Sequence, residues 1–188
     1  ACLVGSEMCI RDRFWERELD LPDEDTEYRM YEDTAAILGE YGFHQYEISN
    51  YAKKGQECRH NKGYWQRTDY LGLGLGASSL VDHVRFSNTD NMEEYLRNSA
   101  FPEKIRCDRE TLTEADEMAE FMFLGLRMTE GVSVREFEEY FGKNMERIYG
   151  EVLKKHFALG MLKKKNDRIF LTRRGIHVSN GVMADFLL

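Results

Sequence analysis

Residues 162–171 read LKKKNDRIFL, and this short stretch decides the fold of the C-terminal half. Two runs that can form strands flank Asn166-Asp167, a pair typical of a tight turn, so the stretch predicts a β-hairpin. Three helices are predicted before it. The first two are capped by Thr113 and Ser133, and the third covers residues 145–157, where apolar residues recur at helical spacing. Three helices followed by a hairpin is the order of a winged helix.

A winged-helix-like domain is therefore expected over residues 106–188, closed by a last helix that Thr172 caps. Residues 14–105 have a different character, with glycine-rich and aromatic segments between short periodic runs. The elements expected there are a helix after Leu21–Thr26, a strand over 43–48, an irregular stretch over 49–66, a strand over 70–81, its hairpin partner over 84–88, a short helix over 91–97 and a connection over 99–107. Together these elements predict an α+β fragment.

Composition excludes several classes of protein. The 188 residues carry a formal net charge of −8, which repels nucleic-acid backbones at long range and argues against nucleic acid as the main partner. No stretch approaches the roughly 18 apolar residues that span a bilayer. The four cysteines fit neither a zinc pattern nor a CxxxCxxC cluster motif, and no signal peptide is visible. A cytoplasmic protein with reduced thiols is expected.

The first residues have an unusual origin. Residues 3–13 read LVGSEMCIRDR, and back-translation of residues 7–13 gives the end of a transposon adapter used in sequencing libraries. We therefore expect residues 1–13 to be such an artefact and no part of the native fold. The native sequence would then start near Phe14, and a domain upstream of it is not excluded.

Residues 58–65, CRHNKGYW, gather the side chains with the most chemistry. Imidazole and thiolate are both iron ligands in haem proteins, which makes His60 and Cys58 candidate ligands. Arg59 could pair with a propionate carboxylate through its forked donors, and Tyr64 and Trp65 could stack on a flat macrocycle. The same residues could also form a hydrogen-bonded loop between two strands, with no ligand.

A resemblance extends this interpretation. The segments YEISNYA (46–52), CRHNKGYW (58–65) and DYLGLGLGAS (69–78) together resemble the distal part of the oxygen-independent coproporphyrinogen III oxidase-like radical-SAM family. The stretch LTRRGIHVSN (171–180) is similar to the family's C-terminal end. The HNxxYW pattern within residues 60–65 resembles the signature of the family's haem-chaperone branch.

The resemblance implies the tail of a radical-SAM (β/α) barrel with a trailing hairpin over residues 14–105, followed by the winged-helix-like C-terminal domain. It implies a [4Fe–4S] cluster and S-adenosylmethionine in the full-length parent, held by residues upstream of Phe14, so that this chain alone would perform no radical chemistry. Gly76, Ala77 and Ser78 would lie near the cofactor site, although many relatives carry histidine at the position of Ser78.

The function implied by the resemblance is a haem chaperone, which binds haem through His60 and passes it to an acceptor protein. Two alternatives stay open from the sequence. The first is an oxygen-independent coproporphyrinogen III oxidase, which the HNxxYW pattern disfavours. The second is a winged-helix module that binds nucleic acid through the basic run Lys163–Lys165, which the acidic net charge disfavours.

Overall fold

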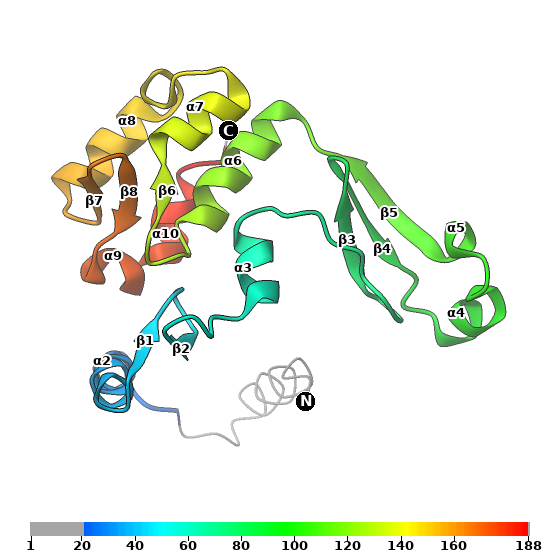
Figure 1. Ribbon diagram of the computed structural model, residues 1–188, viewed down its shortest axis with the longest axis horizontal. Coiled ribbons are helices and arrows are strands. Elements are labelled where there is room, and N and C mark those ends of the chain that lie inside the picture. Colours follow the sequence, from blue (N-terminus) through cyan, green and yellow to red (C-terminus); the bar gives the residue numbers. More distant parts are fainter. Residues whose placement is uncertain (1–20, 188) are drawn as a thin grey trace. The chain divides into compact units, whose positions relative to one another are not determined.

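The structure is a computed structural model that describes residues 21–187 (Figure 1). The expected adapter segment, residues 1–13, lies outside the described residues. Contacts divide the chain into two units, Ala1–Tyr41 and Gly42–Leu188.

The described part of the first unit is one helix, α2 (Glu24–Glu40). Asp23 caps it, because the Asp23 carboxylate accepts a hydrogen bond of 2.7 Å from the backbone N–H of Thr26. Acidic residues fill the first turn, where the helix dipole favours negative charge. The predicted helix start is confirmed.

The second unit begins with a small hairpin and a short helix. Strands β1 (Phe43–Gln45) and β2 (Tyr51–Lys53) pair antiparallel, and α3 (Arg59–Trp65) follows. The predicted strand over 43–48 is therefore half as long as expected. The prediction of an irregular stretch over 49–66 is wrong at β2 and at α3, whose first turn has no capping side chain to reveal it in the sequence.

A three-stranded antiparallel sheet comes next, in the order β3 (Ser78–Val81), β4 (Val84–Asn88) and β5 (Arg106–Thr111). The hairpin between β3 and β4 is confirmed, and its two turn residues, Asp82 and His83, both have positive φ, as a tight hairpin turn requires. The helices α4 (Met92–Asn98) and α5 (Pro102–Ile105) lie between β4 and β5. The expected connection over 99–107 thus contains α5 and the start of β5.

The prediction of one strand over 70–81 is wrong in its glycine-rich half, because the regular strand starts only at Ser78. Before it the backbone folds closely on itself. A Cβ on Gly72 would lie 2.2 Å from the Ser78 carbonyl oxygen, so this position requires glycine. The buried Asn88 side chain donates to the carbonyls of Gly72 (3.3 Å) and Gly74 (2.8 Å) and fixes the glycine segment beside β4.

The C-terminal region contains α6 (Glu114–Gly125), α7 (Val134–Phe141) and α8 (Met145–Ala158), as predicted. The hairpin β7 (Leu162–Lys165) and β8 (Arg168–Leu171) is also confirmed. A short strand that the sequence did not indicate, β6 (Val132–Ser133), pairs with β8 and gives the order β6-β8-β7. The expected last helix is divided into α9 (Arg173–His177) and α10 (Ser179–Ala184).

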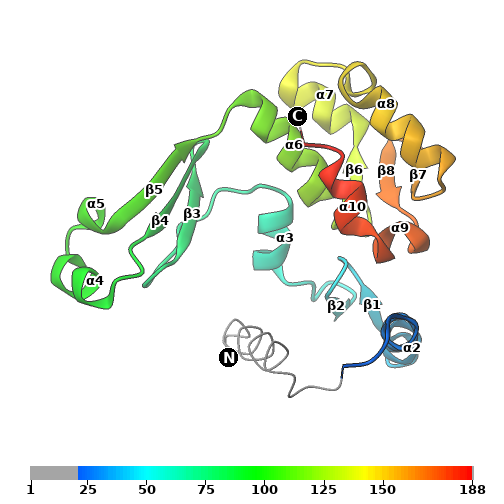
Figure 2. The same ribbon diagram turned by 180° about the vertical axis from the view of Figure 1, so that it is seen from behind.

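These elements share one core. Figures 1 and 2 show the helices gathered around the β6-β8-β7 sheet. The fully buried side chains of this core come from α6, α7, α8, β7, β8 and the C-terminal end, and include Met122, Phe137, Met145, Tyr149, Leu162, Ile169 and Phe186. The described chain is therefore of mixed α and β structure. Within the described residues, no helix is both long and apolar enough to cross a bilayer.

Candidate functional site

The candidate ligands lie at the start of α3. Cys58 is the residue before the helix, and Arg59 and His60 form its first turn; all three are exposed. The His60 ring contacts the Tyr64 ring edge-on, with a centroid distance of 4.5 Å, because residues four apart lie on one face of a helix. Neither ring nitrogen of His60 has a hydrogen-bond partner in the described part of the chain. The His60 imidazole thus packs against Tyr64 and has no polar partner within the described residues.

A second aromatic contact connects this face of α3 to the sheet. Tyr64 meets Tyr70 edge-on at 4.5 Å, and Tyr70 exchanges two backbone hydrogen bonds with Leu80 of β3, of 2.8 and 3.0 Å. Burial, the largest cause, raises the pKa of the Tyr70 hydroxyl, so this hydroxyl stays neutral at physiological pH. The sequence did not indicate Tyr70 as a site residue. The available signal was an aromatic residue six positions after Tyr64.

Trp65 does not lie on the face of α3 that carries His60. His60 and Trp65 are five positions apart, which places their side chains about 140° apart around the helix axis at 3.6 residues per turn. The Trp65 ring instead packs against the guanidinium of Arg127, 4.3 Å from the ring centroid. The structure therefore brings His60 and Tyr64 together and separates Trp65 from this pair, while Cys58 and Arg59 precede His60 at the start of α3.

The three residues expected near a cofactor are held by backbone contacts. Gly76 has φ of +65° and donates its N–H to the Thr89 carbonyl at 3.0 Å. The Ala77 carbonyl accepts from the Asn88 N–H at 2.9 Å, and Ser78 is an exposed residue at the start of β3. Within the described residues, the Ser78 hydroxyl has no hydrogen-bond partner.

The donor set does not suit a cluster or a chelated ion. Within residues 21–187, no group of three or more His, Cys, Asp or Glu side chains could hold a metal. The described cysteines are Cys58, before α3, and Cys107, which lies in β5 beside the Ser87 hydroxyl at 3.6 Å. These residues do not fit a [4Fe–4S] cluster, which needs several thiolates together. Haem iron needs only one or two axial ligands and remains compatible with α3.

A buried ionic network lies where a loop and a hairpin meet α6. Arg67 contacts Glu117 at 3.1 Å and Glu120 at 3.2 Å, and each of these three side chains is at most 10% exposed. Arg85 of β4 reaches Glu120 at 2.6 Å, and His83 pairs with Glu117. The hydrogen bond to Glu117, together with the charge of its carboxylate, raises the pKa of the His83 imidazole. This network ties the β3–β4 hairpin to α6.

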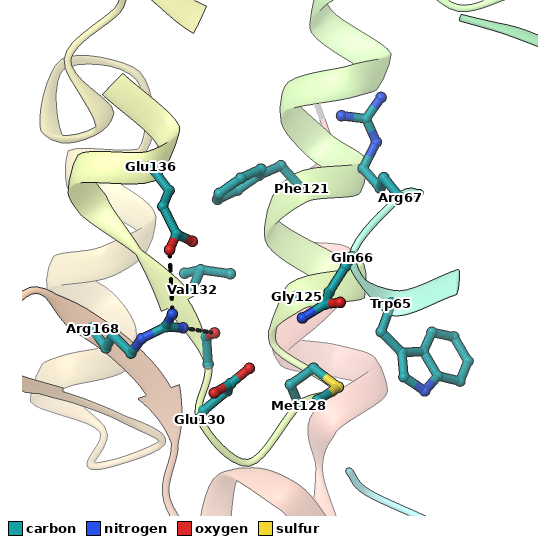
Figure 3. A pocket seen from close by; sticks show the side chains of 11 residues that line it. Trp65, Gln66, Arg67, Phe121, Gly125, Met128, Glu130, Val132, Glu136 and Arg168 are labelled. Atoms are coloured by element: carbon teal, nitrogen blue, oxygen red, sulfur yellow. Dashed lines mark hydrogen bonds and ion pairs between the residues drawn. The ribbon is translucent and has the colours of Figure 1, made fainter. Parts of the chain in front are cut away.

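Two hollows adjoin Trp65. The smaller, about 150 Å³, lies below the size of usual ligand pockets. Figure 3 shows that Arg168 and Glu136 in its wall pair with each other, at 3.4 Å, while Trp65 points away from them. The larger, about 390 Å³, is an apolar groove whose wall includes the charged Arg127. Its other lining residues come from α3, α6 and the C-terminal end: Trp65, Phe123, Leu124, Asn180, Met183, Ala184 and Leu187.

Comparison with known proteins adds the family. Residues 112–178 match the HemN C-terminal domain. The chain is 37% identical over 170 residues to the "Heme chaperone HemW" of Lactococcus lactis, covering 90% of this chain and 44% of that protein. It is 35% identical over 172 residues to the "Heme chaperone HemW" of Bacillus subtilis, covering 90% of this chain and 45% of that protein. The chain thus spans somewhat less than half the length of these relatives.

A solved structure supports the fold. The coproporphyrinogen III oxidase HemN of Escherichia coli, described as a radical SAM enzyme, superposes with a TM-score of 0.71 over 89% of this chain and 42% of that one. Its sequence identity is 17%, so this likeness concerns the fold alone. The chain therefore belongs to the coproporphyrinogen III oxidase-like radical-SAM family and carries the C-terminal domain of that family, with haem chaperones among its relatives in sequence.

Proposed function

We propose that the protein to which this chain belongs is a haem chaperone, which binds haem and transfers it to an acceptor protein. The observation that carries the proposal is the match to curated haem chaperones across 90% of the chain at 35–37% identity. The matched stretch includes α3, whose HNxxYW sequence resembles the signature of this branch and so favours it over the oxidases. Coproporphyrinogen oxidation is the alternative, and its support is a likeness of fold at 17% identity.

Haem would bind on the exposed face of α3. His60 is the proposed iron ligand, with Cys58 as the alternative, because both are exposed and the His60 nitrogens have no protein partner within residues 21–187. Tyr64 would pack against the ligand ring, and Arg59 would pair with a propionate. Trp65, proposed from the sequence as a stacking residue, would contribute to haem binding indirectly, because it anchors the other side of α3 against Arg127.

The exposure of this site suits a carrier. A haem held by one face of a short helix buries little apolar area, so its release costs less free energy than release from an enclosed pocket. An acceptor protein with such a pocket could therefore take the haem from α3 by direct contact. The proposed partners are haem and this acceptor. Nucleic acid is not among them, and the proposed location is the cytoplasm.

We also propose how the chain divides into domains. Residues 14–105 would be the tail of a radical-SAM barrel with its hairpin, and residues 106–188 the winged-helix-like domain. The element order α6, α7, α8, β7, β8 supports the latter. Strand β5, residues 106–111, starts at this proposed boundary and pairs with β4.

The cluster and S-adenosylmethionine of the parent would be held by the part of its relatives' length that this chain does not span. Gly76, Ala77 and Ser78 are the proposed contacts to that cofactor site from this chain. The two described cysteines do not fit the cluster, so no step of cluster chemistry is assigned to these residues.

A haemin titration followed by absorbance tests the function. The unmutated chain should show a saturable Soret shift. His60→Ala should lower the haemin affinity at least tenfold, because removal of an iron ligand worth more than about 1.4 kcal/mol has that effect. His44→Ala is the matched control, because His44 is also exposed but pairs with Glu57 at 3.0 Å. Cys58→Ala identifies a thiolate contribution. Absence of a saturable Soret shift in the folded, unmutated chain would refute haem binding by this chain.

A further inference from the structure

The C-terminal end of α3 is fixed at a joint of three chain segments. The backbone of residues 46–48 pairs with the turn after α6: the Ile48 N–H donates to the Arg127 carbonyl at 3.0 Å, and the Thr129 N–H donates to the Tyr46 carbonyl at 3.1 Å. The position of the Arg127 backbone is therefore set by hydrogen bonds, independently of its side chain.

The Arg127 side chain lies between a buried acid and an aromatic ring. One of its terminal nitrogens is 3.7 Å from Glu47 Oε2, and its guanidinium lies 4.3 Å from the centre of the Trp65 ring. Glu47 is fully buried, and its other oxygen accepts from Ser49 N–H at 2.9 Å and Asn50 Nδ2 at 2.6 Å. A buried carboxylate requires such a cation, so Glu47 holds Arg127 against Trp65.

Hydrogen bonding at this joint is incomplete. Glu47 Oε2, Arg127 Nε and Trp65 Nε1 are all buried and lack a hydrogen-bond partner within the described residues. Buried polar atoms without partners cost free energy and call for an explanation beyond stability. Replacing a buried ion pair by apolar residues of similar volume is often neutral or stabilising, so stability alone does not account for the stacked cation, which points to a role in orientation.

Orientation of α3 is what haem binding on this helix needs. Two side chains on one face of α3 are held by the joint: Trp65 by Arg127, and Asn61 by the Tyr46 hydroxyl at 3.4 Å. Because these anchors fix the rotation of a seven-residue helix, they also fix the direction in which His60 points from the other side.

We propose that Arg127 is a positioning residue for haem: held by Glu47 and stacked on Trp65, it sets the rotation of α3 and so the presentation of His60. This proposal rests on the proposed haem-binding function and assigns to the end of α6 a part in it. Arg127 acts through Trp65 and need not touch the haem.

Two variants separate positioning from folding. Arg127→Lys keeps a cation near Glu47 but removes the planar group that stacks on Trp65. The double variant Glu47→Gln with Arg127→Leu removes the stack and leaves no unpaired charge, while the carbonyl oxygen of the introduced amide would still accept the hydrogen bonds that Glu47 Oε1 accepts. Both are made with Trp15→Phe, which leaves Trp65 as the single tryptophan of the chain. The same chain with Trp15→Phe alone is the reference.

Haem affinity and, without haem, acrylamide quenching of Trp65 fluorescence are measured for each variant. We expect thermal midpoints close to the reference, stronger quenching of Trp65, and haem affinity weaker by about tenfold, the range of a desolvated cation–π contact. Unchanged haem affinity or unchanged quenching in both variants would overturn the positioning role while leaving the haem-binding function intact. Absence of saturable haem binding by the folded reference would overturn the function, and the positioning role with it.

Discussion

Replacing Arg67 by methionine should strongly destabilise the unit Gly42–Leu188. Arg67 is 9% exposed and is in contact with two carboxylates, Glu117 and Glu120, that are 10% and 6% exposed. Removal of one partner from a buried ion pair costs about 3–5 kcal/mol, because the remaining charge stays desolvated. Arg85 still reaches Glu120 at 2.6 Å, so the lower end, about 3 kcal/mol, is expected.

Urea unfolding followed by circular dichroism measures this loss. With a slope of about 1–3 kcal/mol per molar urea, the midpoint of Arg67→Met should fall by roughly 1–3 M. Arg135→Met is the control: Arg135 lies 3.9 Å from Glu139, and both side chains are more than 70% exposed, so its midpoint should not change. A midpoint for Arg67→Met equal to that of Arg135→Met would refute the view that the buried network holds the hairpin on α6.

Two further perturbations follow from the structure. Glu117 raises the pKa of His83, so the stabilising contribution of this pair is complete below the ordinary pKa of 6.5 and is lost as pH rises through the elevated pKa. The urea midpoint should therefore decline over this pH range, and His83→Gln should abolish the decline. A pH profile that His83→Gln leaves unchanged would contradict this role of the pair. Gly131→Ala should destabilise the fold by more than about 3 kcal/mol, because its Cβ would lie 2.0 Å from the Ile169 carbonyl oxygen. Gly142 has a similar φ, +63° against +67° at Gly131, but a Cβ added there would have no atom within 4 Å, so Gly142→Ala should cost only about 1–2 kcal/mol. Equal losses of the two variants in thermal unfolding would show that backbone strain, and not the close contact, dominates.

Local signals explain what the sequence predicted well. The start of α6 is marked by a full capping box, in which Thr113 and Asp116 bond each other's backbone N–H groups. Ser133 and Asn144 cap the next two helices through their side-chain oxygens. Caps and apolar periodicity are properties of adjacent residues, so the order of the C-terminal elements was visible without any long-range information.

Long-range contacts explain what the sequence did not reveal. Helix α3 has no capping side chain and contains Gly63, so its stability comes from tertiary anchors such as Trp65. The glycine-rich segment looked like a strand, but Gly72 is there because the Ser78 carbonyl approaches it. The Arg67 network joins residues 34 to 53 positions apart, which no local pattern reveals.

The candidate site shows the same division. The residue types in CRHNKGYW indicated haem chemistry, and the structure places Cys58, Arg59 and His60 at the exposed start of a short helix, where the His60 ring contacts Tyr64. The partition between His60 and Trp65 depends on α3 being helical. Since the sequence did not predict that helix, it could not separate a ligand-facing residue from an anchoring one.

Chemical rescue of a cavity variant tests the central claim most directly, that His60 on α3 binds haem iron. The His60→Gly chain is titrated with haemin by absorbance, with and without imidazole, beside the parent and beside haemin with imidazole alone. Because His60 is exposed, free imidazole should reach the vacated position, so the variant should lose the parent's Soret shift and regain it when imidazole is added. A His60→Gly chain that binds haemin as the parent does, or whose spectrum with imidazole equals that of haemin and imidazole without protein, would contradict the account.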